Sequence, residues 1–183
     1  VSNKTFLYDV KCSKSLEDEI IKLGGTPYCY RTGNSYTRAK VEELDLAFGG
    51  ELSGHVYFRD KFLGFDSGIY AGLRLLEILS NTNKTVEDLL AGINRYYSTP
   101  ETKYKTKDEI KFDVVKKIED YCKEKNYTYN NIDGVRVTFA DGWASVRASN
   151  TGPNLTARFE ATTEERLDEI KNEFENLIFK YNK

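Results

Sequence analysis

The sequence predicts two small domains, an α/β domain over residues 1–98 and an α+β domain over residues 99–183. In the first part, short apolar runs alternate with segments of helical periodicity, a pattern typical of βαβ units. In the second part, two amphipathic segments flank three consecutive strand-like runs. Residues 94–108 have no apolar period and contain Pro100, so we expect an interdomain linker there.

The first domain opens on an apolar run at residues 5–10, which predicts a buried strand. A helix follows, with Ser15 as the expected N-cap and Gly24 and Gly25 as its end. The remaining expected elements are a strand at 27–31, a helix at 36–44, strands at 46–48 and 56–58, a helix at 69–79 and a helix capped by Thr85. This order predicts a mixed sheet sandwiched by helices.

The second domain opens on an amphipathic helix whose apolar positions run from Ile110 to Cys122 and which is expected to end near Asn126. Asp141 and Gly142 mark a hairpin, and Thr162 or Thr163 caps a last helix that runs to about Tyr181. The strands between the two helices are expected at 135–139, 144–148 and 155–161. The order α-β-β-β-α predicts a small antiparallel sheet with helices on one face.

The composition excludes several classes of protein. The sequence has 27 Lys plus Arg and 29 Asp plus Glu, so it has no excess of positive charge with which to bind a nucleic acid. We therefore do not expect a nucleic acid as a partner. The longest apolar run, residues 71–79, is far shorter than the roughly 20 residues of a membrane span, so no membrane contact is expected. The odd, scattered cysteines Cys12, Cys29 and Cys122 predict reduced thiols, no zinc site and a cytoplasmic location.

The glycine-rich run 49–55 is the first of three segments with polar groups that a fold does not require. If residues 51–55 are extended, alternation places Glu51, Ser53 and His55 on one side. A carboxylate, a hydroxyl and an imidazole in a row can exchange hydrogen bonds with the hydroxyls of a sugar. The alternative is the polar face of a solvated loop or edge strand.

The second segment lies where a strand ends and turn residues begin. Its polar residues are Arg147, Ser149, Asn150 and Thr151. A guanidinium, two hydroxyls, an amide and free backbone N–H groups can together bind a phosphate dianion. The alternative is an ordinary hairpin corner in which the polar side chains bond their own backbone.

The third segment follows the first strand, at the edge where open α/β sheets bind ligands. Lys11 could contact phosphate or exchange a proton there, and the alternative is a solvated ion pair with Asp9. Cys12 is interpreted as a small buried side chain, since no histidine lies near it in the sequence. The sequence contains no Walker loop, no G-x-G-x-x-G, no G-x-S-x-G and no Asp cluster with metal-ligand spacing.

Two of these runs resemble a known family. Residues 8–12 and 50–56 resemble the third domain of the bacterial phosphomannomutase/phosphoglucomutase group of the α-D-phosphohexomutase superfamily. The runs 133–137, 142–143, 146–151 and 158–161 follow the order of its fourth domain. The resemblance covers essentially the whole chain and implies a TATA-binding-protein-like fold for the second domain.

The resemblance also implies a role for each candidate residue. Glu51, Ser53 and His55 would form the sugar-binding loop, and Lys11 would lie at the reaction centre with a role in proton transfer. The loop that grips the non-reacting phosphate would comprise Arg147, Ser149, Asn150 and Thr151. Asn34 stands where the family commonly has a histidine, so only hydrogen bonding to the substrate is expected of it.

The family interconverts hexose 1-phosphates and hexose 6-phosphates of glucose or mannose through a bisphosphate that turns end for end. By the resemblance, the phosphoserine and the magnesium ligands belong to the first two domains, and neither is in this sequence. We therefore expect an inactive substrate-recognition half, with Val1 as a cut end, no metal of its own, and the missing N-terminal domains as partners. The alternatives are a piece of a phosphoglucosamine mutase, or a non-catalytic phosphosugar-binding module.

Overall fold

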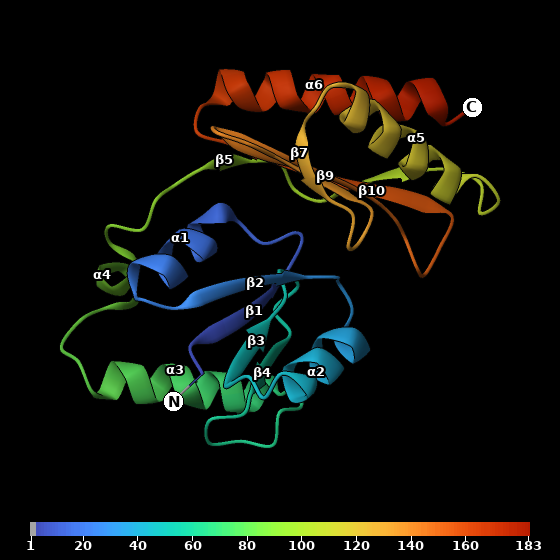
Figure 1. The fold of residues 1–183 in the computed structure, drawn as a ribbon. Helices are drawn as coiled ribbons and strands as arrows, with labels where there is room; N and C mark the ends of the chain where they lie inside the picture. Colours follow the sequence, from blue (N-terminus) through green and yellow to red (C-terminus); the bar gives the residue numbers. More distant parts are fainter. Residues whose placement is uncertain (1–2) are drawn as a thin grey trace. The chain divides into compact units, whose positions relative to one another are not determined.

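The computed structural model describes residues 3–183, which form two units that divide between Asn94 and Arg95 (Figure 1). The first unit contains a four-stranded sheet of order β2-β1-β3-β4, in which β1 pairs in parallel with β2 and β3, and β4 pairs antiparallel with β3. Its elements are β1 (Thr5–Asp9), α1 (Lys14–Lys22), β2 (Thr26–Tyr30), α2 (Asn34–Glu43), β3 (Phe48–Gly50), β4 (Val56–Phe58), α3 (Gly68–Ser80) and α4 (Val86–Leu90).

Both faces of this sheet are covered because neighbouring residues of β1 point to opposite sides. Leu7 packs in a cluster with Val41 of α2, whereas Tyr8 packs in a second cluster with Ile20 of α1. The helix α2 can approach β3 closely only because Gly49 has no side chain, since a Cβ there would lie 2.5 Å from Val41 Cγ2. The mixed sheet sandwiched by helices is confirmed.

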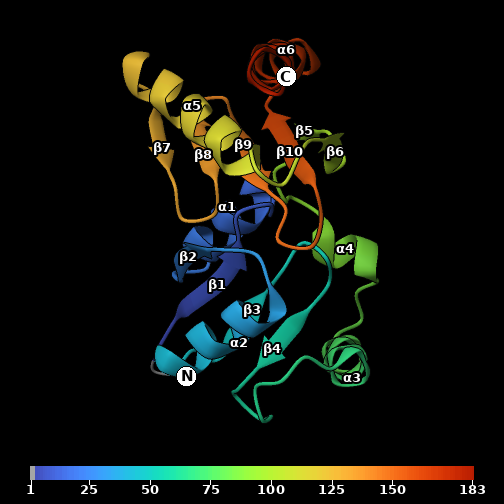
Figure 2. The same cartoon turned by 90° about the vertical axis from the view of Figure 1, so that its right-hand side faces the viewer.

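The second unit is an antiparallel sheet of order β5-β10-β9-β8-β7, with β6 also paired to β10. Figure 2 shows α5 and α6 on the same side of this sheet, as predicted. The elements are β5 (Tyr97–Ser98), β6 (Thr102–Lys105), α5 (Lys111–Glu124), β7 (Thr128–Asn130), β8 (Val135–Phe139), β9 (Gly142–Ala148), β10 (Asn154–Ala161) and α6 (Glu164–Tyr181). The apolar stripe of α6, including Ile170 and Phe174, packs in one core cluster with alternate residues of β8, β9 and β10.

The two units divide within residues 94–108, after Asn94, but most of this segment belongs to the second unit and is not a linker. This segment forms β5 and β6, which both hydrogen-bond to β10. Its sequence gives little sign of this because an edge strand is held by backbone bonds and carries few apolar side chains. The partly buried Tyr104, between the exposed Lys103 and Lys105, is the one trace of alternation. The short strand β7, at the other edge of this sheet, is not predicted from the sequence for the same reason.

The helix caps are close to those expected. Ser13, not Ser15, caps α1, and its hydroxyl accepts from the backbone N–H of Ser15. Thr85 forms a capping box with Asp88 at the start of α4, and Thr163 caps α6. The structure thus decides between Thr162 and Thr163, and moves the first cap by two residues.

Gly134 follows Asp133 and precedes β8. A glycine is needed at this position because of the backbone conformation and because neighbouring atoms leave no room for a side chain. Its φ is +81°, and a Cβ there would meet the Val146 carbonyl and lie 2.7 Å from Arg147 Cα. We predict that Gly134→Ala lowers the free energy of unfolding of the second unit by about 3 kcal/mol. The measurement is urea unfolding followed by fluorescence of Trp143, the single tryptophan of the chain.

The matched control is Asn126→Ala, an exposed residue of the same unit with φ +55°. This change tests the effect of the positive φ alone, without a steric clash, and should lower the free energy of unfolding by about 1 kcal/mol. Equal losses for the two variants would show that the close approach at Gly134 is unimportant.

Candidate functional site

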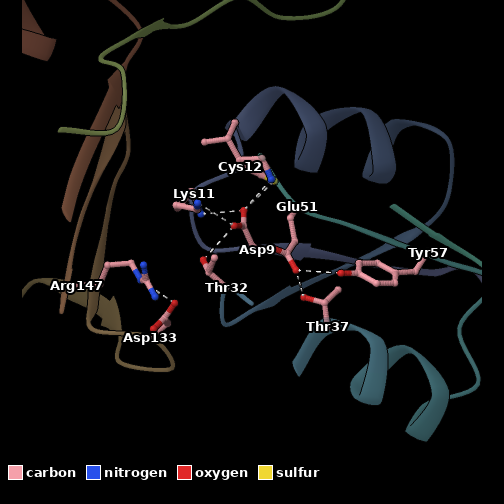
Figure 3. Close-up of polar contacts among 10 residues, drawn as sticks. Asp9, Lys11, Cys12, Thr32, Thr37, Glu51, Tyr57, Asp133 and Arg147 are labelled. Atoms are coloured by element: carbon pink, nitrogen blue, oxygen red, sulfur yellow. Dashed lines mark hydrogen bonds and ion pairs between the residues drawn. The ribbon is translucent and has the colours of Figure 1, made fainter. Parts of the chain in front are cut away.

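Asp9, at the end of β1, is a fully buried carboxylate that joins three loops (Figure 3). Its Oδ1 accepts from the backbone N–H groups of Lys11 and Leu52, both at 3.3 Å, and from the Cys12 thiol at 3.2 Å. Its Oδ2 accepts from the Thr32 hydroxyl at 3.0 Å. These donors follow β1, β2 and β3, so Asp9 fixes the loops at the carboxyl ends of the parallel strands, where open α/β sheets bind ligands.

Lys11 belongs to this cluster and is largely buried, with 9% of its surface exposed. Its ammonium lies 3.8 Å from Asp9 Oδ2. The alternative of a solvated surface pair is therefore excluded, because both members of the pair are buried. Cys12 is a small buried side chain, as expected, and none of the three cysteines forms a disulfide.

Glu51, directly after β3, is the second buried carboxylate of the first unit. Its Oε1 accepts from the Thr37 hydroxyl of α2 at 2.7 Å and from the Tyr57 hydroxyl of β4 at 3.4 Å (Figure 3). Burial, together with the charge of Glu51, raises the pKa of the Tyr57 phenol, which therefore stays protonated as a donor. Both donors engage Oε1, so neither bond occupies Oε2.

Residues 51–55 are not extended, so the condition for placing Glu51, Ser53 and His55 on one side is not met. The backbone forms a closed turn in which Glu51 donates to the His55 carbonyl at 2.9 Å and Gly54 donates to the Glu51 carbonyl at 3.0 Å. Gly54 has φ +90°, a conformation that glycine adopts without strain. The turn breaks the alternation, so Glu51 points into the unit while Ser53 and His55 are exposed.

His55 and Asn34 have separate surroundings. His55 Nδ1 lies 2.6 Å from Asp66 Oδ2, in the loop before α3. Asn34 is the exposed first residue of α2, and its backbone carbonyl accepts from Tyr57 at 3.4 Å. Of the sugar-loop candidates, only Glu51 is therefore held in place by buried partners.

Arg147, near the end of β9, is the charged centre of the second unit's candidate site (Figure 3). Its Nε donates to Asp133 Oδ2 at 2.9 Å, and both residues are 8% exposed. Val146 and Ala148 face the core, so alternation puts Arg147 on the opposite face of the sheet. The bond to Asp133 uses Nε, which allows the terminal nitrogens of the guanidinium to bind an anion.

The loop after β9 is closed by its own hydrogen bonds. Ser149 N–H donates to the Asn154 carbonyl at 2.9 Å, and Asn154 N–H donates to the Gly152 carbonyl at 2.8 Å. The Ser149 hydroxyl accepts from Thr151 N–H at 3.3 Å and lies 3.4 Å from the Thr151 hydroxyl. The local bonds of a hairpin corner are thus present, and they gather two hydroxyls and Asn150 on one short loop.

Among residues 3–183, no group of three or more His, Cys, Asp or Glu side chains is placed so that it could hold a metal ion. Within the same range, no helix is both long enough and apolar enough to span a membrane.

Several residues of these clusters were not predicted from the sequence. Thr32, Thr37 and Tyr57 carry no motif, and each meets its carboxylate across 6 to 23 residues of chain. Asp133 lies in a run that the resemblance covers, but its bond to Arg147 follows only from the pairing of β8 with β9. A buried carboxylate requires donors, yet the sequence does not say which ones.

The fold is that of the phosphohexomutases. A solved structure of a phosphoglucomutase/phosphomannomutase family protein from Burkholderia thailandensis superposes with a TM-score of 0.85 at 36% identity, covering 96% of this chain and 37% of that one. Residues 1–96 match "Phosphoglucomutase/phosphomannomutase, alpha/beta/alpha domain III", and residues 101–177 match "Phosphoglucomutase/phosphomannomutase, C-terminal domain". The chain belongs to the phosphoglucomutase/phosphomannomutase family, which confirms the resemblance.

Its relatives are considerably longer. The phosphomannomutase/phosphoglucomutase of Pseudomonas aeruginosa is 40% identical over 94% of this chain, which spans 37% of that protein. The phosphoglucomutase of Neisseria gonorrhoeae is 36% identical over 94% of this chain, which spans 38% of it. The matched part of each relative corresponds to the two units described above.

The Asp9 cluster gives a direct prediction. Asp9→Ala should lower the free energy of unfolding of the first unit by about 3 kcal/mol, because it removes the acceptor of two buried donors, the Lys11 N–H and the Cys12 thiol. Native-state hydrogen exchange at the β1 amides measures the loss. Glu43→Ala, which removes a carboxylate that is 60% exposed, is the control and should change stability by less than about 0.5 kcal/mol. Similar exchange rates in the two variants would contradict the role assigned to Asp9.

Proposed function

We propose that this chain is the substrate-recognition half of a phosphomannomutase/phosphoglucomutase that interconverts hexose 1-phosphates and hexose 6-phosphates through a bisphosphate intermediate. Membership of the family supports the class of reaction. The observation that carries the proposal is the buried Arg147–Asp133 pair beside a short loop of hydroxyl donors. In such an enzyme the bisphosphate turns end for end, so a single phosphate site must bind the non-reacting phosphate in both orientations of the sugar.

The second unit would bind the phosphate that does not react. Arg147 is held by Asp133 in one orientation, so its terminal nitrogens can donate two parallel bonds to phosphate oxygens. Ser149, Asn150 and Thr151 would add neutral donors from the loop. Because the guanidinium is fixed before the ligand arrives, little side-chain entropy is lost on binding.

The first unit would bind the sugar. Glu51 is held through Oε1 by Thr37 and Tyr57, so Oε2 is in a position to accept from a sugar hydroxyl. Ser53 and His55, on the exposed part of the same turn, would add weaker and more mobile contacts. A carboxylate fixed by two protein donors accepts a ligand hydroxyl without rearrangement.

Lys11 would contact a ligand oxygen near the transferred phosphate and take part in proton transfer. Its ammonium is close to the Asp9 carboxylate and largely buried, where its interaction with an anionic ligand is stronger than in water. The phosphoserine and the metal loop that the family carries elsewhere are not among these 183 residues. We therefore propose that the chain alone binds hexose phosphates without converting them.

The first test is binding of glucose 6-phosphate, followed by ¹H–¹⁵N NMR. We predict binding in the roughly millimolar range with shifts at residues 147–151, and at least about tenfold weaker binding by Arg147→Gln, which keeps a bond to Asp133 but loses the charge. Arg166→Gln, a charge loss at a more exposed arginine of the same unit, should leave the affinity unchanged. Absence of shifts at millimolar ligand in the unsubstituted chain would overturn the proposal.

The second test separates the sugar from the phosphate. Glu51→Gln should weaken glucose 6-phosphate binding by about fivefold while inorganic phosphate binds as before, because phosphate has no sugar hydroxyl to donate. Arg147→Gln should weaken both ligands. The control for Glu51 is Glu43→Gln, an exposed carboxylate of α2. If Glu51→Gln weakens the binding of inorganic phosphate as much as that of glucose 6-phosphate, Glu51 does not contact the sugar.

A further inference from the structure

Lys111, the first residue of α5, is a buried cation beneath the loop that follows β9. Only 8% of its surface is exposed. Its ammonium donates to the Ser149 carbonyl at 2.8 Å, to the Gly152 carbonyl at 3.4 Å and to Asp108 Oδ1 at 2.8 Å. All three hydrogens of the ammonium are thus directed at acceptors, and two of these acceptors belong to the loop.

The position of Lys111 is not explained by the needs of the helix. Lysine is among the residues that are least often buried, because its charge is strongly hydrated. At the first residue of a helix a positive charge also opposes the helix dipole. Asp108, its carboxylate partner, is 62% exposed, so water screens the charge of Asp108 more than that of Lys111. The result is a positive charge directly under residues 149–152.

The contact with Ser149 also orients the backbone of the loop. The peptide bonds of the described residues are trans, so the carbonyl of Ser149 and the N–H of Asn150 point in opposite directions. When Lys111 binds that carbonyl, the N–H of Asn150 is directed away from Lys111. The Ser149 hydroxyl, bonded to Thr151 N–H, belongs to the same short loop.

We propose that Lys111 is a positioning residue of the phosphate loop. It holds residues 149–152 in one conformation, turns the Asn150 N–H outward as a donor, and adds a buried positive charge on the far side of the loop from a bound phosphate. This inference rests on the proposed function, since it takes residues 149–151 as the phosphate-binding loop. Lys111 acts through the backbone of that loop and does not itself contact the ligand.

The test uses inorganic phosphate as the probe and the 183-residue chain as the protein, with NMR titration as the measurement. Lys111→Met should weaken phosphate binding by about tenfold and should shift the Asn150 and Thr151 amides before any phosphate is added. Lys111→Arg, which restores a charged donor for the two carbonyls, should bind within about threefold of the unsubstituted chain. Lys116→Met removes a charge from an exposed lysine of the same helix and should change neither measurement.

The outcomes separate the two proposals. If the unsubstituted chain does not bind phosphate, the proposed function is wrong. If the unsubstituted chain binds phosphate and the affinity of Lys111→Met is within about twofold of its affinity, only the role proposed for Lys111 is wrong. Fluorescence of Trp143 reports whether each variant is folded, and if Lys111→Met is not, Lys111→Gln takes its place with the same thresholds. Weakening by Lys116→Met equal to that by Lys111→Met would mean that net charge alone matters, which also overturns the inference.

Discussion

The first unit depends on the burial of the Asp9 carboxylate. A charge removed from water is stable only if protein donors replace its hydration, and Asp9 obtains these donors from the loops after β1, β2 and β3. The three loops share the Asp9 carboxylate as an acceptor. Movement of any one loop would therefore remove a donor from this buried charge or expose it to water. Because Leu52 N–H is one of the donors, the turn that presents Glu51 is tied to the same carboxylate. The geometry of the candidate sugar site is therefore a consequence of how the sheet buries Asp9.

The second unit follows the same rule with cations at its candidate site. Arg147 is held by Asp133, and Lys111 is held by Asp108 and two loop carbonyls. Each of these side chains loses its rotational freedom when the unit folds, so binding of a ligand does not have to order it again. Folding and recognition thus share one set of bonds. A substitution at such a residue should affect stability and affinity together, which is why neutral variants that keep a hydrogen bond are more informative than alanine.

Elements with a clear apolar period could be predicted from the sequence, and those held by the backbone could not. The helix α6 carries its buried stripe in the sequence, whereas β5, β6 and β7 are polar edge or near-edge strands whose partners lie far along the chain. The candidate site divides in the same way. The residue types at Lys11, Glu51 and Arg147 are sufficient to single them out. Asp9, the partner of Lys11, is adjacent in the sequence, but Thr37 and Asp133, the partners of Glu51 and Arg147, depend on tertiary contacts. The row of Glu51, Ser53 and His55 that an extended backbone would give is not formed, because residues 51–55 close a turn at Gly54.

The geometry of Glu51 also bears on the choice between mannose and glucose under the proposed function. A carboxylate oxygen accepts a hydrogen bond from any hydroxyl within reach, and it has no donor with which to distinguish an axial from an equatorial oxygen. Strong discrimination requires a buried group that is left unpaired by the wrong substrate. Glu51 Oε1 is already paired with Thr37 and Tyr57, and Oε2 would accept from a hydroxyl of either epimer that comes within reach, so neither epimer leaves Glu51 unpaired. A sugar site built on such a residue should bind both epimers with similar affinity, and any preference between them must then arise from groups other than Glu51.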